Sequence, residues 1–237
     1  MTILAIDTSA AVSAALVQLD GTELASVVIH EQRRHAEQLA PLIADLLSQT
    51  GLSSTDITAV AVGTGPAPFT GLRVGLVSAQ TFALGVGAQT FGVSSLDALG
   101  TQAAIELDLA PGTEILVTAD ARRKEIYFAR YEVLDRVNFE VPTLRLITEP
   151  SVDKATQVVS DGHADGAIVV GPGAVLYKEA FAGQTVAESD ELVAVNPTVL
   201  ARTALARRQA GKAQPTTPLY LRRPDAQVPA ARKRALA

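Results

Sequence analysis

The residues best suited to chemistry near the N-terminus are Asp7, Thr8 and Ser9, which directly follow an apolar run. A carboxylate at the end of a strand, followed by a turn rich in hydroxyl and N–H groups, can hold Mg²⁺ and receive a phosphate. This turn contains no glycine, so its backbone cannot easily approach a phosphate. The alternative is a structural role, in which the three side chains cap a hairpin turn through local hydrogen bonds. We therefore treat Asp7, Thr8 and Ser9 as degenerate phosphate-loop positions.

A second candidate is the loop over residues 63–73, which reads Gly-Thr-Gly-Pro-Ala-Pro-Phe-Thr-Gly-Leu-Arg. It lies between a predicted buried strand and a predicted helix, so the N–H groups that begin the helix could cradle an anion. The loop lacks the Lys-Ser/Thr ending of a P-loop. Thr70 is a suitable N-cap for the helix. A shaped turn without a ligand is the interpretation that the residues alone favour.

Metal and nucleophilic chemistry find little support in the sequence. There is no cysteine, which excludes thiolate nucleophiles and cysteine-based zinc or iron–sulfur sites. The three histidines are His30, His35 and His163, and we expect them on the surface or in loops. His30 and His35 are five residues apart across a predicted strand–helix boundary, so they do not form a two-histidine clip. No serine lies in a Gly-x-Ser-x-Gly elbow. We expect neither a catalytic residue nor a metal site.

The composition indicates a globular chain with a sizeable core. Its 237 residues are 48% hydrophobic and 19% charged. A net charge of −5 and a pI near 5.2 argue against a free-standing nucleic-acid-binding protein. The most apolar run, residues 74–86, is too short for a membrane helix and indicates a buried one. No basic region precedes the first apolar run, so we expect no signal peptide and a cytoplasmic protein.

The chemistry-bearing turns must be positioned by strands and helices that the hydrophobic pattern predicts. Three antiparallel strands come first, over Ile3–Asp7, Val12–Leu19 and Glu23–His30. A helix over Ala36–Leu47, with Pro41 inside it, comes next. The remaining elements of this half are a strand over Thr58–Val62, a helix from about Gly71, a strand over Thr90–Val93 and a helix from about Ser94.

The same pattern then begins again. Ile115–Ala119, ending in Asp120, repeats the first strand ending in Asp7, and Ile126–Val133 supplies the next hairpin arm. Ile168–Val170, followed by Gly-Pro-Gly, repeats the strand that precedes the glycine-rich loop. Two tandem units of this kind predict an α/β protein with a duplicated ribonuclease H-like, actin-like ATPase fold in two lobes. We expect lobes over 1–112 and 113–214, and a C-terminal tail over 215–237.

The helix after the glycine-rich loop carries a stripe of small residues. Gly71, Gly75, Ala79 and Ala83 recur every four positions, and the other faces are also largely apolar. A helix that is apolar all round should be buried on more than one side. A stripe of small residues suits the close approach of another backbone. The helix could be covered by its own domain, or one face could dock another subunit.

Several segments together resemble the TsaB family, also called YeaZ. The family pattern Gly-Pro-Gly-Ser-Phe-Thr-Gly-Leu-Arg-hydrophobic-Gly is matched by Gly65-Pro66 and Phe69–Gly75, whereas Ala67-Pro68 departs from it. The run Ile-Leu-Ala-Ile-Asp-Thr-Ser at residues 3–9, the first helix from Arg34 to Pro41, and Pro218–Arg222 also resemble the family. The resemblance therefore covers nearly the whole chain.

The resemblance implies a two-lobed actin-type fold without a working catalytic centre. The catalytic relative TsaD carries a His-x-x-x-His metal pair in its third helix, and Ser95 and Leu99 occupy these positions here. Leucine cannot ligate a metal, and serine is a poor ligand for Fe²⁺ or Zn²⁺. The implied role is that of a non-catalytic subunit that docks and activates TsaD and works with the ATPase TsaE. The complex transfers threonylcarbamoyl to adenosine 37 of tRNAs that read ANN codons, and this chain would contact tRNA only through the complex.

Two helices of the N-terminal lobe are the expected partner interface. The residues we expect there are apolar or small side chains of the first and second helices: Leu39, Ile43, Leu46, Gly75, Ala79 and Ala83. The first-helix set could instead face the core. A homodimer of the isolated chain also remains open. No membrane partner is expected.

Other functions remain as alternatives. An actin-fold kinase or carbamoyltransferase, acting with ATP on a small molecule, is favoured by the matching places of Asp7 and Asp120. Under the leading hypothesis no cofactor is expected, beyond weak binding of ATP or ADP. A metallopeptidase is the third alternative, without support from the residues. The basic tail, with Arg222, Arg223, Arg232, Lys233 and Arg234, could contact tRNA or be a solvated C-terminus.

Overall fold

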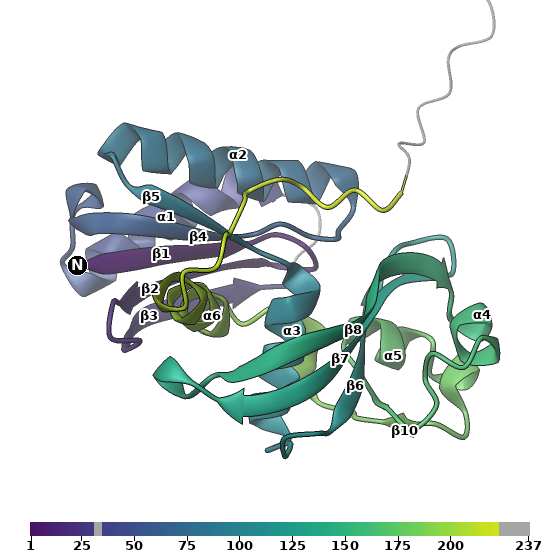
Figure 1. The fold of residues 1–237 in the computed structure, drawn as a ribbon. Helices are drawn as coiled ribbons and strands as arrows, with labels where there is room; N and C mark the ends of the chain where they lie inside the picture. The colour runs from purple at the N-terminus through teal and green to yellow at the C-terminus, as the bar shows by residue number, and fades with distance from the viewer. Residues whose placement is uncertain (31–34, 223–237) are drawn as a thin grey trace, which may run out of the picture.

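The computed structural model describes residues 1–30 and 35–222, which form two five-stranded mixed sheets (Figure 1). In the first sheet, β1 pairs antiparallel with β2 and parallel with β4, and the strand order is β3-β2-β1-β4-β5. These strands are β1 (Thr2–Asp7), β2 (Val12–Gln18), β3 (Glu23–Ile29), β4 (Ile57–Gly63) and β5 (Gln89–Val93). The predicted run of three antiparallel strands is therefore confirmed.

The second sheet repeats this arrangement. Its strand order is β10-β9-β6-β7-β8, with β6 antiparallel to β7 and parallel to β9. The strands are β6 (Glu114–Asp120), β7 (Glu125–Arg136), β8 (Pro142–Lys154), β9 (Ile168–Val170) and β10 (Thr185–Val186). Since β6 takes the place of β1 and β9 that of β4, the prediction of a duplicated actin-like α/β fold is confirmed.

The first sheet is covered on both faces, which explains why β1 is apolar at successive positions. Leu4 and Ile6 face α1 (His35–Thr50) and α2 (Phe69–Val86), which lie side by side on one face. Ile3 and Ala5 face the opposite side, where they join the cluster formed by α3 (Ser95–Glu106) and α6 (Pro197–Gln209). This second cluster continues into the second sheet through Ile115 and Val117, so it joins the two halves.

The position of α6 differs from the expected division into lobes. The helix falls within the expected C-terminal lobe over 113–214, but it packs against β1, β2 and β3 of the first sheet (Figure 1). Its buried side chains, Leu200, Ala201 and Ala204 among them, supply the apolar cover for that face. By packing, the last helix therefore belongs with the N-terminal sheet.

Short helices complete the second half and the connections. α4 (Ala155–Ser160) and the 3-10 helix η3 (Lys178–Phe181) cover the outer face of the second sheet, where Leu116 and Phe128 are buried. The others are α5 (Pro172–Leu176), η1 (Ser54–Asp56), η2 (Asn138–Glu140) and η4 (Asp190–Val193).

Helix α2 is buried on one side only, contrary to the expectation from its composition. Its covered side consists of Leu72, Gly75, Leu76, Ala79 and Ala83. On the opposite side Val77 is 59% exposed and Leu84 is 85% exposed. Length and composition alone would allow α2 to cross a membrane, but here it packs on the first sheet as a surface helix. It therefore leaves apolar side chains on the surface.

The expected partner-facing residues lie inside the chain. All six, Leu39, Ile43, Leu46, Gly75, Ala79 and Ala83, are buried. They pack between α1, α2 and the sheet. The structure thus corrects the assignment and favours the alternative that these faces are core. A partner that docked on α1 and α2 would instead contact the exposed residues on the outer faces of these helices.

The segment after α6 lies along the first sheet, beside β5 and then α2 (Figure 1). The Gly92 amide donates to the Gln214 carbonyl at 3.0 Å, and the Leu219 amide donates to the Thr64 carbonyl at 2.9 Å. Of the expected tail over 215–237, residues 215–222 are therefore held against the first sheet and α2, although Pro215, Thr217 and Tyr220 are exposed. The other basic positions of the tail, from Arg223 onward, lie outside the described residues.

Candidate functional site

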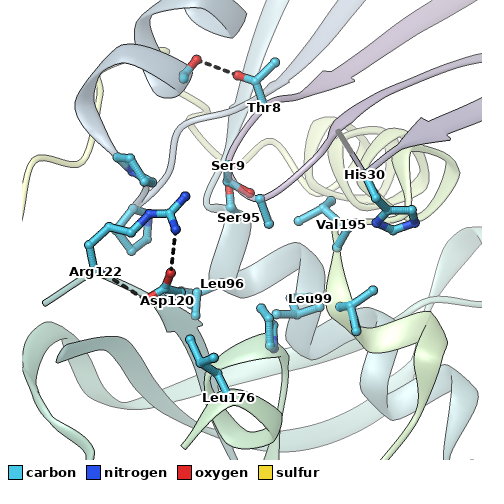
Figure 2. Close-up of a pocket in the computed structure, with 18 of the residues that line it drawn as sticks. Thr8, Ser9, His30, Ser95, Leu96, Leu99, Asp120, Arg122, Leu176 and Val195 are labelled. Atoms are coloured by element: carbon cyan, nitrogen blue, oxygen red, sulfur yellow. Dashed lines mark hydrogen bonds and ion pairs between the residues drawn. The ribbon is translucent and has the colours of Figure 1, made fainter. Parts of the chain in front are cut away.

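A cleft of about 610 Å³ lies between the two sheets, where an actin-like fold would hold a ligand (Figure 2). The turn after β1 contributes Thr8 and Ser9, and the turn after β6 contributes Asp120 and Arg122. Much of the remaining lining is apolar and comes from several other segments. It includes Pro66, Pro68, Leu96, Leu99, Leu176 and Val195.

Asp7 is not part of this lining, and its side chain is buried, with 2% of its surface exposed. It accepts hydrogen bonds from the Ser9 amide at 2.8 Å, the Ser9 hydroxyl at 2.5 Å and the Ser95 hydroxyl at 2.7 Å. Gly63 leaves room for this arrangement, since a Cβ there would lie 1.8 Å from Asp7 Oδ2. These are the hydrogen bonds that the turn-capping role requires, and they occupy the oxygens that a Mg²⁺ ion would need.

Burial also changes the protonation of Asp7. Desolvation raises the pKa of its carboxyl group, and the hydrogen bonds from Ser9 and Ser95 oppose that rise. A carboxyl group that is costly to ionise is a poor holder for a hydrated cation. The electrostatics thus agree with a structural role.

Thr8 ties the turn after β1 to helix α2. Its hydroxyl donates to the Gly71 carbonyl at 2.7 Å, an interaction drawn in Figure 2. A Cβ at Gly75 would lie 2.4 Å from Thr8 Oγ1, and one at Gly71 would lie 2.8 Å from the Thr8 carbonyl oxygen. The backbone that approaches the small-residue stripe most closely, at its N-terminal end, is therefore that of the chain itself.

Asp120 occupies the matching position in the second half, but it faces the cleft. It accepts from the Arg122 amide at 2.8 Å and forms an ion pair of 3.4 Å with the Arg122 guanidinium (Figure 2). The Tyr177 hydroxyl donates to it at 3.4 Å. Desolvation and the negative charge of Asp120 raise the pKa of Tyr177. The two acidic residues that the repeat pairs thus have different surroundings, and only one can reach a bound molecule.

The glycine-rich loop is held by contacts within the protein. The Ser95 amide donates to the Gly65 carbonyl at 2.7 Å, and the Gly65 amide donates to Ser95 Oγ at 3.3 Å. Helix α2 begins at Phe69 with Pro68 as its N-cap, so Thr70 is inside the first turn and is not the predicted cap. The loop is a shaped turn that supports Asp7 through Ser95.

Ser95 and Leu99, which the resemblance places at the positions of a metal pair in TsaD, are used for structural contacts. The Ser95 hydroxyl donates to Asp7, and Leu99 is 3% exposed in the core between the halves. Within residues 1–30 and 35–222, no group of three His, Asp or Glu side chains could hold a metal ion. His30 is exposed at the rim of the cleft, and His163 lies with its ring centroid 5.1 Å from that of Phe128.

The sequence analysis did not predict one cluster of side chains, which is formed by Phe69, Arg73 and Tyr220. The Arg73 guanidinium lies 3.8 Å from the centroid of the Phe69 ring, and Arg73 Nε donates to the Tyr220 hydroxyl at 3.0 Å. The spacing of Phe69 and Arg73, four residues apart in a helix, signals that the two side chains meet. No local sequence pattern predicts the contact with Tyr220, because this residue is 147 residues from Arg73 in the chain.

Comparison of the chain with known proteins identifies its family. The family model described as TsaD, tRNA N6-adenosine threonylcarbamoyltransferase, matches residues 23–187. The chain is 30% identical over 227 residues to the Haemophilus influenzae protein TsaB, covering 94% of each. The chain belongs to the TsaB family. The Haemophilus member bears the name tRNA threonylcarbamoyladenosine biosynthesis protein, as does an Escherichia coli TsaB that is 39% identical over 132 residues, 56% of this chain and 55% of that one.

A solved structure of the family has the same architecture. YeaZ from Pseudomonas aeruginosa superposes with a TM-score of 0.73 at 25% identity, over 93% of this chain and all of that one. The resemblance to the TsaB family inferred from the sequence is thus confirmed.

Proposed function

We propose that this TsaB-family chain is a non-catalytic subunit of the machinery that forms N6-threonylcarbamoyladenosine in tRNA. Its role is to dock a TsaD-like catalytic subunit, which works with a TsaE-like ATPase on adenosine 37 of tRNAs that read ANN codons. The naming of its relatives supports the pathway. The observation that carries the docking role is the exposed apolar face of α2.

The described side chains support the proposal that the chain itself does not carry out the catalysis. Asp7 is buried and hydrogen-bonded, and Ser95 and Leu99 stand where TsaD has its metal pair. Asp120 is engaged with Arg122. These residues would not bind a metal, so we assign the chemistry to the partner.

The docking surface that we propose is the outer face of α2 together with that of α1. Val77 and Leu84 are seven residues apart, so they lie on the same face two turns apart. Exposed apolar side chains along one helix face suit a partner helix packed against it. The adjacent outer face of α1 carries the small exposed residues Ala40, Ala44 and Ser48, which let another helix approach closely.

The test is a pair of charge substitutions on this face. Leu84→Glu and Val77→Glu should each weaken binding of a purified TsaD-like subunit by at least about 30-fold, the effect of losing a buried interface anchor. The folded chain should be unchanged, because both side chains are exposed. Ile147→Glu is the matched control, since Ile147 is an apolar residue of β8 that is 43% exposed in the other half. Calorimetry or a pull-down measures the binding.

Equal binding by all three variants would overturn the proposed surface.

We further propose that the same face of α2 forms a homodimer interface when no partner is present. Leu84→Glu should then shift the isolated chain to a monomer in gel filtration, whereas Ile147→Glu should not.

A further inference from the structure

The chain after α6 contacts both halves of the molecule at the edge of the cleft. We call its residues 214–222 the strap, and they contain no helix or strand. The strap runs beside β5 and then along α2 of the first half (Figure 1). Its last residue, Arg222, reaches the second half. One short segment therefore links the two halves.

The strap is attached to α2 as well as to the first sheet. In addition to its two backbone hydrogen bonds with the sheet, it receives two side-chain hydrogen bonds from α2. The Gln80 amide group donates to the Thr216 hydroxyl at 3.0 Å, and Arg73 Nε donates to the Tyr220 hydroxyl at 3.0 Å. Arg73 and Gln80 are seven residues apart, so they lie on the same face of the helix. The strap therefore follows one face of α2 over about two turns.

The other end of the strap is bonded to the turn between β6 and β7. The Arg222 guanidinium donates to the Ala121 carbonyl at 2.7 Å and forms an ion pair of 3.2 Å with Glu125. The side chains of Arg222 and Glu125 are 22% and 30% exposed, so water and salt screen this pair less than they would screen a fully exposed one. Ala121 directly follows Asp120, which lines the cleft. The strap thus holds the turn that supplies this part of the cleft.

The two halves are also joined through their packed core, on the α3 side of the cleft. Leu96 and Leu99 of α3 line the cleft and belong to the apolar cluster that the halves share. Next to them in the chain, Asp97 accepts a hydrogen bond of 2.7 Å from the hydroxyl of Tyr131 in β7. These contacts fix α3 against the second sheet, so α3 is suited to act as the hinge between the halves.

The strap lies at the edge of the same cleft, away from this core. Pro68 and Arg122 line both the cleft and a small hollow that Arg222 also lines. Pro68 comes from the first half and Arg122 from the second, so the strap spans the two halves at this edge. A rotation of the halves about α3 would separate this edge and would have to break the contacts of Arg222.

We propose that the strap is a tether that limits how far the cleft between the two halves can open. Hinge motion of two lobes around the site between them is a common conformational change in proteins. The strap opposes it by fastening α2 to the turn after β6. Because α2 also carries the proposed docking face, the same tether connects that face to the width of the cleft. The tether itself does not depend on the proposed function, and it is tested on the isolated chain.

The experiment measures the distance between the halves by double electron–electron resonance. The chain has no cysteine, so Val77→Cys in α2 and Thr156→Cys in α4 provide two unique sites for nitroxide labels, both exposed. Labelled protein is diluted into an excess of unlabelled protein to suppress distances between molecules. In this background Arg222→Ala should raise the ratio of longer to shorter distances about tenfold or more, the factor that corresponds to one hydrogen bond to a charged group.

A matched control removes an ion pair that lies within one half. Arg145 of β8 pairs with Glu132 of β7, so Arg145→Ala loses the same kind of contact without releasing the strap. Its distance distribution should be that of the labelled parent. If Arg222→Ala also leaves the distribution unchanged, or if the two variants change it equally, the tether is overturned.

Release of the opposite end should have the same effect, because a tether needs both attachments. In Leu219→Pro/Tyr220→Ala the proline has no amide to donate to Thr64, and the alanine loses the hydroxyl that accepts from Arg73. This double variant should also increase the longer distances. A change in only one of the two releases would show that the strap does not act as a link between the halves.

A milder variant guards against loss of the fold. Glu125→Gln removes the charge that pairs with Arg222 but leaves the hydrogen bond to the Ala121 carbonyl, so it should give a smaller shift in the same direction. Thermal melts show which variants are folded at the temperature of labelling. If Arg222→Ala is unfolded, Glu125→Gln decides, and a distribution equal to that of the parent would overturn the proposal. Because no partner is present, this result is separate from the test of docking.

Discussion

The Ser95 hydroxyl donates a 2.7 Å hydrogen bond to the carboxylate of Asp7, although the two residues are 88 positions apart in the chain. Both are buried, and they link the turn after β1 to the first turn of α3. In an actin-like enzyme the acidic residue of this turn would face a metal and a phosphate. Here the carboxylate is used to hold the fold together.

Removal of this hydroxyl should destabilise the protein. Ser95→Ala leaves the buried Asp7 carboxylate without one of its three donors, and a hydrogen bond to a charged group contributes about 1.5–3 kcal/mol to the free energy of unfolding. Urea denaturation of wild type and variant measures the difference. Ser151→Ala is the control: its hydroxyl bonds an exposed carbonyl, so we expect a change within about 0.5 kcal/mol. Equal stability of the two variants would mean that the Asp7–Ser95 contact contributes nothing.

Asp7 should also leave a signature in the pH dependence of stability. Because burial raises its pKa, the folded state holds this proton more tightly than the unfolded state. The resulting contribution to stability is full below the unfolded pKa of about 3.8 and is lost as the pH rises through the folded pKa. Relative to Asp7→Asn, which cannot ionise, wild type should therefore lose stability as the pH rises above the unfolded pKa of about 3.8 and through the raised folded pKa. Urea titrations of both proteins at several pH values check this, and a difference that stays constant or changes in the opposite direction would contradict it.

The sequence predicted the fold well and the surfaces poorly, for a physical reason. Alternating and continuous apolar runs indicate which segments are buried. The acidic residue that ends a strand in each half, Asp7 and Asp120, indicated the duplication. Such patterns do not say what covers an apolar helix. The residues chosen as a partner interface on α2, Ala79 among them, face the chain's own sheet, and the exposed side is marked instead by Val77 and Leu84.

Contacts between distant segments were also invisible to local patterns. Tyr220 reaches Arg73 because the chain after α6 returns across the first sheet. The same return places Pro215 against Gly92, where a Cβ would lie 2.1 Å from the Pro215 carbonyl oxygen. Only the folded chain brings such pairs together.

Nucleotide binding separates the proposed subunit from the kinase-like alternative. The cleft between the sheets is large enough to hold a small ligand. Of the two matched acidic residues, Asp7 and Asp120, only Asp120 lines it. We expect Mg-ATP and Mg-ADP to bind with dissociation constants no tighter than about 1 mM, a free energy of about −4 kcal/mol. Calorimetry tests this. A micromolar constant that Asp120→Ala or Asp7→Ala abolishes would favour an actin-fold enzyme instead.

Gly75 and Gly85 of α2 provide a matched pair that tests its packing. A Cβ at Gly75 would lie 2.4 Å from the Thr8 hydroxyl oxygen, whereas one at Gly85 would meet nothing within 4 Å. Gly85→Ala should stabilise the protein by about 0.5–1 kcal/mol, because alanine favours the helix. Gly75→Ala gains the same helix preference but must displace Thr8, whose hydroxyl is bonded to Gly71. Overpacking outweighs the gain, so we expect a net loss of about 1–2 kcal/mol. Urea midpoints of the two variants measure the contrast, and a stabilising Gly75→Ala would show that Thr8 is not the close neighbour that limits this face of α2.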